Sequence, residues 1–82
     1  MWYKYASAEK AFNKMADQLL ETSIKKQYWL AHHVFPSVQE LNLAKKRAMN
    51  FIKNNYGSLW DLRNENMDRK IQSIVDEVKI TI

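Results

Sequence analysis

The chain has 82 residues, of which 46% are hydrophobic and 27% charged, with a formal net charge of +4 and no cysteine. Its apolar content excludes the disordered class, and the absence of cysteine excludes a disulfide framework and a thiolate metal site. No apolar run is long enough to span a bilayer, and the N-terminal residues lack a secretory apolar region, so we expect a cytoplasmic protein.

One glycine and one proline in the whole chain predict helices joined by short connections, because hairpins and irregular loops depend on these residues. We therefore expect an all-α fold in which residues 1–82 form one compact bundle of four main amphipathic helices plus a short connecting helix. The many lysine and asparagine residues are typical of an AT-rich coding sequence, such as that of a low-GC bacterium or its phage.

The first predicted helix spans residues 7–22 and has Ser7 as its N-cap. Charged and amide side chains occupy its outer face. The opposite face carries apolar residues that recur every three or four positions, namely Ala8, Ala11, Phe12, Met15, Ala16, Leu19 and Leu20. This separation predicts a helix that packs along one side of the bundle.

The second predicted helix spans residues 24–35 and has Ser23 as its N-cap, while a single bent helix over residues 7–35 is the alternative. The helix ends at Phe35, because the proline that follows disfavours the helical conformation there. Its expected apolar face consists of Ile24, Tyr28, Leu30, Ala31, Val34 and Phe35.

The third predicted helix spans residues 38–56 and has the clearest boundaries in the chain. Ser37 and Glu40 form a capping-box pattern, in which each side chain satisfies the backbone N–H of the other residue. Gly57 stands just after the helix, where a left-handed residue is favoured. Both ends of this helix are therefore defined by local chemistry alone.

Two further helices are predicted in the C-terminal third. Ser58 and Asp61 repeat the capping pattern and indicate a short helix over residues 59–63, followed by a polar turn. A last helix over residues 67–79 has a narrow apolar face formed by Met67, Ile71, Ile74, Val75 and Val78. The residues that follow either fray or add a short strand.

Residues with catalytic or ligating chemistry are present, but not in the arrangements that such chemistry needs. His32 and His33 are adjacent, so on a helix they point about 100° apart and cannot easily share one metal ion. The serines are explained as helix caps, and one glycine cannot form a phosphate-binding loop. We therefore expect a protein that is not an enzyme and has no catalytic residue, cofactor or metal.

The second predicted helix carries a tryptophan in an unusual position. Lys25, Trp29 and His33 follow one another at intervals of four residues, on the side opposite the expected apolar face. A tryptophan beside a cation on a polar face is typical of a protein-binding hot spot. The other interpretation is that a second layer covers this helix and buries Trp29, and the central position of the helix in a small bundle slightly favours this interpretation.

The third predicted helix carries a basic strip formed by Lys46 and Lys53, with Arg47 beside it. Three consecutive helical residues point in three directions, so a solvated face is favoured over a surface that follows phosphates. Lys45 projects among apolar neighbours. Its side chain either snorkels along them or forms an ion pair with an acidic residue late in the chain.

The function we expect is binding and regulation of a larger protein partner, through Lys25, Lys26, Trp29, His33, Lys46, Arg47 and Lys53. Nucleic acid, contacted by the basic third helix, is the first alternative partner. A membrane-protein partner, as for an immunity or antiholin-like protein, is the second. We do not expect direct membrane binding, because the core consumes the apolar faces. Trp2, Tyr3 and Tyr5 either pack against the start of the first helix, which we slightly favour, or form a contact for homo-oligomers.

Overall fold

The computed structural model describes residues 2–79, and the side chains of residues 7–79. It consists of α1 (Trp2–His32), α2 (Val38–Tyr56), the 3-10 turn η1 (Trp60–Leu62) and α3 (Met67–Val78), and no strand occurs within residues 2–79. The prediction of a compact all-α fold is confirmed. The prediction of four main helices is wrong, because three helices and a 3-10 turn form the fold.

The missing helix boundary lies at Ser23, where the chain stays helical instead of breaking between residues 22 and 24. Ser23 is buried and its hydroxyl donates a hydrogen bond to Gln72 Oε1 at 3.0 Å, so its side chain joins α1 to α3 and does not cap a helix. Ser7 is not an N-cap either, because α1 begins at Trp2. The single-helix alternative was therefore the better interpretation.

The predicted helix end at Phe35 is also wrong, because α1 ends at His32 and His33 already has a φ of +59°. The boundaries of α2 agree with the prediction, and those of α3 agree to within one residue. The Ser37 and Glu40 capping box is present, and Gly57 follows α2 with a φ of +97°. The capping pattern predicted at Ser58 and Asp61 is only partly present. The Asp61 backbone N–H donates to the Ser58 hydroxyl, which in turn donates to Asp61 Oδ2, but the 3-10 turn spans only Trp60–Leu62 and has no side-chain cap. Asn66 caps α3 by accepting a hydrogen bond from the Arg69 backbone N–H.

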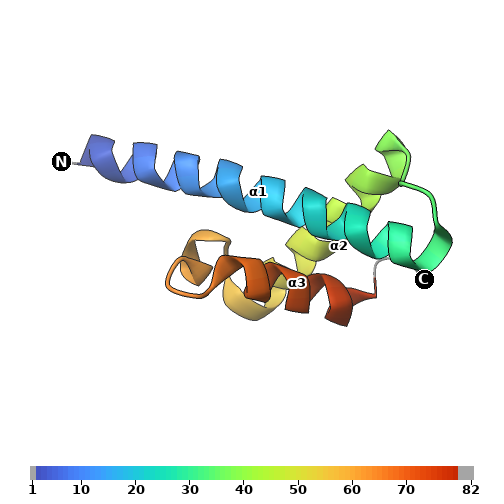
Figure 1. Ribbon diagram of the computed structural model, residues 1–82. Coiled ribbons are helices and arrows are strands. Elements are labelled where there is room, and N and C mark those ends of the chain that lie inside the picture. Colours follow the sequence, from blue (N-terminus) through green and yellow to red (C-terminus); the bar gives the residue numbers. More distant parts are fainter. Residues whose placement is uncertain (1, 80–82) are drawn as a thin grey trace.

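The three helices alternate in direction around a shared core (Figure 1). Asp17 of α1 pairs with Lys45 of α2, and Tyr28 bonds to Glu40, so these two helices are antiparallel. Gln27 contacts Asp76, just as Ser23 contacts Gln72, so α3 runs parallel to α1. The molecule is elongated, about 47 Å by 22 Å by 19 Å, because the N-terminal turns of α1 project beyond the rest.

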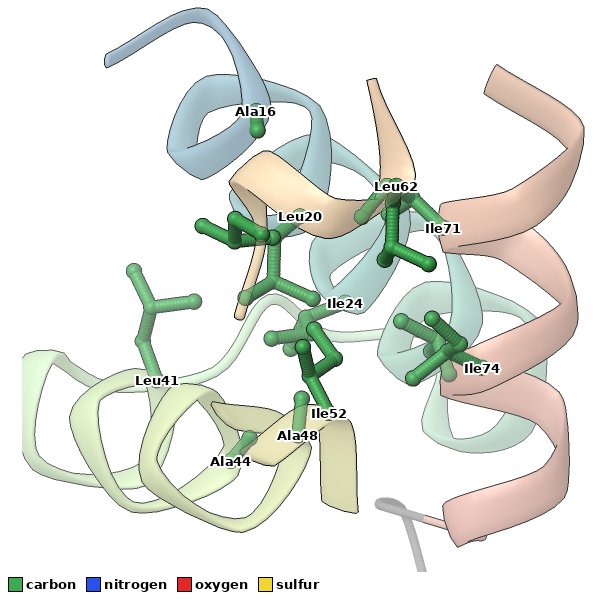
Figure 2. Close-up of a cluster of buried hydrophobic side chains, with 12 residues drawn as sticks. Ala16, Leu20, Ile24, Leu41, Ala44, Ala48, Ile52, Leu62, Ile71 and Ile74 are labelled. Atoms are coloured by element: carbon green, nitrogen blue, oxygen red, sulfur yellow. The ribbon is translucent and has the colours of Figure 1, made fainter. Parts of the chain in front are cut away.

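The core lies where the second half of α1 meets α2 and α3 (Figure 2). Small residues of α2, such as Ala44 and Ala48, let that helix approach α1 closely. The largest fully buried side chains are Leu20, Ile24, Ile52, Ile71, Ile74 and Val75. Because all three helices contribute to one cluster, loss of any one of them exposes the others.

Only part of the apolar face predicted for residues 7–22 packs against the rest of the protein. Ala16 and Leu20 are buried and Phe12 packs edge-on against Trp60 at 5.5 Å between ring centroids, whereas Ala8, Ala11 and Met15 are exposed. These exposed residues are on the projecting part of α1. The packing role predicted for the side chains of Trp2, Tyr3 and Tyr5 and the strand suggested for residues 80–82 lie outside the described residues.

No helix within the described residues combines the length and the apolar character that are needed to cross a membrane.

Candidate functional site

Five large apolar side chains are exposed together at the corner where α1 turns into α2. We call this group the end patch, and it consists of Trp29, Leu30, Val34, Phe35 and Val38. Their exposed fractions range from 44% for Trp29 to 74% for Val38. Single exposed apolar residues are ordinary, but a group of five at one corner is typical of an interaction surface.

The end patch corrects the apolar face predicted for residues 24–35, of which only Ile24 is fully buried. The last turn of α3 lies beside Gln27, whose side-chain amide contacts the Val75 carbonyl at 3.3 Å and Asp76 at 3.0 Å. α3 ends at Val78, close to this point. Within the described residues, α3 does not continue past Val78 alongside the last turn of α1, and the end patch is exposed.

Local backbone chemistry turns the chain at this corner. His33 ends α1 in the left-handed region, with a φ of +59°, and its N–H donates to the Trp29 carbonyl at 2.8 Å. Histidine tolerates this conformation better than most side chains do. The reversal brings Phe35 back against Trp29, and the two rings stack with their centroids 5.4 Å apart.

Trp29 is therefore a surface residue, and the interpretation that placed it in the core is wrong. Trp29 is 44% exposed, and Phe35 stacks on one side of its ring. His33 contacts the ring edge to face, with 5.8 Å between the ring centroids. Contacts on two sides restrict the rotamers of the indole. A fixed aromatic platform loses little side-chain entropy when a partner binds to it.

A hydrogen bond between helices fixes the geometry behind the end patch. The Tyr28 hydroxyl donates to Glu40 Oε2, and the other carboxylate oxygen accepts the Ser37 backbone N–H at 3.0 Å. The hydrogen bond with Tyr28 lowers the pKa of Glu40, and the same bond raises the pKa of Tyr28. One carboxylate thus caps α2 and ties it to α1.

This contact predicts a loss of stability at both ends of the pH scale. The lowered pKa of Glu40 means that its contribution is present above the usual value of 4.5 and is lost as the pH falls below it. The raised pKa of Tyr28 means that its contribution is present below 10.0 and is lost above it. We expect the melting temperature of the wild type to exceed that of Tyr28→Phe most at neutral pH. A difference that stays constant from acidic to alkaline pH would contradict this assignment.

The structure brings together some of the predicted partner-binding residues and separates the others. Lys25 and Trp29 lie on successive turns of α1, and His33 follows one turn later, just after the helix ends. Lys26 lies beside Lys25 in the sequence and borders a surface hollow that Asp76 and Glu77 of α3 also line. All four are exposed. These residues and the end patch share one corner of the molecule.

The basic residues of α2 form a separate surface. Lys46, Arg47 and Lys53 are exposed, but Lys46 and Lys53 follow Val38 by about 12 Å and about 22 Å along the helix axis. Lys53 borders a groove of about 610 Å³ whose opposite wall carries Glu9 and Asp17. A phosphate chain in this groove would meet carboxylates as well as cations.

Lys45 forms an ion pair, but not with the late-chain acid that was predicted. Its Nζ lies 3.0 Å from Asp17 Oδ2 of α1, and its side chain is 23% exposed. Asp17 was expected to lie on a solvated face. Apolar periodicity alone could not identify this partner, because it depends on how α1 and α2 are aligned.

No group of three or more histidine, aspartate or glutamate side chains lies close enough to hold a metal ion in the described part of the chain. The His32 ring packs against the Tyr28 ring, with 4.8 Å between their centroids, whereas the His33 ring packs against Trp29. The two imidazoles therefore face different neighbours.

Sequence reasoning missed Leu30, Val34, Phe35 and Val38 as functional candidates. A signal for them exists in the run from Tyr28 to Phe35, whose apolar residues point in nearly every direction around a helix. One helix in a three-helix fold cannot bury all of these directions. The excess apolar surface had to remain exposed.

Comparison of the chain with protein-family models, with curated proteins and with solved structures finds no match.

Proposed function

We propose that this chain is a small, non-enzymatic protein-binding module that docks on a larger partner through the end patch. The observation that supports the proposal is the exposure of five large apolar side chains at one corner while the core beside them is tightly packed. Such a patch offers several hundred Å² of apolar surface, on the order of the largest patches on monomeric proteins. A standard interface buries roughly 800 Å² on each partner, so residues around the patch would have to supply the rest of the contact area.

The composition of the patch supports the same function. Trp29 and Phe35 supply aromatic area that is already ordered by their mutual stacking, and aromatic residues dominate binding energies at interfaces. Lys25 and His33 flank the indole and supply polar contacts at the rim. We take regulation of the partner as the consequence of docking, since the residues at this corner offer contacts and no arrangement for bond chemistry.

The experiment compares substitutions at two exposed apolar residues, one inside the end patch and one outside it. Tagged wild-type protein, Phe35→Asp and Leu43→Asp are used for pull-downs from a lysate of the source cells, with and without nuclease. Phe35 is 66% exposed in the end patch, and Leu43 is 51% exposed elsewhere on α2. We expect a stoichiometric protein that survives nuclease, is retained by Leu43→Asp and is lost from Phe35→Asp.

Two outcomes would contradict the proposal. Equal retention by both variants would remove the end patch from the interaction, and loss of all captured material after nuclease would favour the nucleic-acid alternative. A stability control accompanies them: Trp29→Ala should cost less than about 3–5 kcal/mol, the range for a truncated core tryptophan. A loss of several kcal/mol would mean that Trp29 is a structural residue.

A further inference from the structure

We infer that the partner segment which covers the end patch is amphipathic and acidic, with carboxylates flanking its apolar anchors. This inference rests on the proposed function and specifies the chemistry of the partner. Its basis is the charge of the stretch that carries the patch, because residues 22–39 contain two lysines and no carboxylate.

The stretch that contains the patch is devoid of acids. Residues 22–39 include Lys25, Lys26 and two histidines, but no aspartate or glutamate. The carboxyl end of α1 and the amino end of α2 meet here, so their helix dipoles oppose each other. Side-chain charges therefore decide the sign of the local potential.

The carboxylates nearest to the patch are Glu21, Glu40, and Asp76 and Glu77 of α3, and the last two border the surface hollow that Lys26 also lines. Glu40 accepts hydrogen bonds from Tyr28 and from the Ser37 backbone. Asp76 accepts from Gln27, which lies about 200° around α1 from Trp29. Glu21 approaches Lys25 only to 3.9 Å, and both side chains are exposed, so this pair offers little competition to a bound carboxylate.

A protein segment fits this arrangement better than an anionic membrane does. A membrane surface carries negative charge everywhere and would also meet the exposed Glu40 carboxylate at the same corner. A folded or folding segment can place its carboxylates opposite Lys25, which lies about 160° around α1 from the Gln27 side that meets α3. Its apolar side chains then contact Leu30, Phe35 and their neighbours.

The test uses a random peptide library displayed on phage. Peptides are selected on the full-length wild-type chain and counter-selected on Phe35→Asp, and the selected sequences are compared with the unselected library. We expect enrichment of aspartate and glutamate next to aromatic and aliphatic residues. Enrichment of lysine and arginine, or no charge preference, would overturn the inference.

Two charge-matched variants then locate the effect with the best selected peptide. Lys25→Glu combined with Lys26→Glu should weaken its binding roughly tenfold, as expected for the loss of two exposed ion pairs, and high salt should reduce this difference. Lys46→Glu combined with Lys53→Glu changes the net charge equally and should weaken binding less than about twofold. Equal losses in both variants would reduce the effect to overall charge and overturn the inference.

Failure of the proposed function gives a different result. In that case no selected peptide would distinguish the wild type from Phe35→Asp, whatever its charge. The last experiment measures co-sedimentation of the protein with phosphatidylglycerol vesicles. If no peptide is selected, and the wild type co-sediments whereas Phe35→Asp does not, the patch would be assigned to a membrane surface instead.

Discussion

Replacing Ile24 with alanine is expected to destabilise the protein by about 2–5 kcal/mol, the range for large core truncations. Ile24 is fully buried and lies where α1 meets Ile52 of α2 and Ile74 of α3 (Figure 2). A domain of this size has a total stability of only about 4–12 kcal/mol. The truncation therefore removes a large share of it, and the melting temperature should fall by about 10 °C or more.

The matched control is Leu43→Ala, which removes a similar side chain from an exposed position on α2. Its effect should stay within about 0.5 kcal/mol. Ile24→Val should fall between the two, at about 0.5–1.5 kcal/mol. Urea unfolding followed by circular dichroism measures all three, and similar midpoints for Ile24→Ala and Leu43→Ala would contradict the packing described above.

Local signals in the sequence predicted those parts of the fold that local chemistry determines. The capping box at Ser37 and Glu40 and the glycine after α2 act over a few residues, and both are present in the structure. Ser23 shows the limit of such reasoning. Serine is favourable at a helix start, but here a long-range hydrogen bond to Gln72 gives its hydroxyl a partner inside a continuous helix.

The candidate site was predicted only in part, because exposure depends on where neighbouring helices end. Lys25 and Trp29 lie one turn apart on α1, and His33, which follows the helix, contacts the Trp29 ring. Phe35 stacks on Trp29 and does not lie on the opposite side of the helix, as was predicted. The same helical periodicity assigned Leu30, Val34 and Phe35 to the core, although within the described residues they are exposed and α3 ends at Val78. Periodicity identifies which residues share a face, and it does not reveal whether another helix is long enough to reach that face.

The second large effect is expected at Gly57, the only glycine of the chain. Its φ of +97° is a backbone conformation that side-chain-bearing residues rarely adopt, and its N–H caps α2 by donating to the Ile52 carbonyl. A Cβ at this position would lie 2.7 Å from Asp61 Oδ2. Gly57→Ala should therefore cost about 1–3 kcal/mol, through backbone strain and through displacement of Asp61.

A double-mutant cycle with Asp61→Ala separates these two causes. Asp61→Ala removes the carboxylate that a Cβ would meet, together with the hydrogen bond that this carboxylate accepts from Ser58. If strain dominates, Gly57→Ala destabilises the Asp61→Ala background almost as much as the wild type. If the close contact dominates, most of the cost disappears in that background. We expect strain to remain the larger part, because Asp61 is exposed and can rotate away, whereas the positive φ is fixed by the turn that joins α2 to η1. A Gly57→Ala protein as stable as the wild type would show that the chain leaves α2 by a different turn.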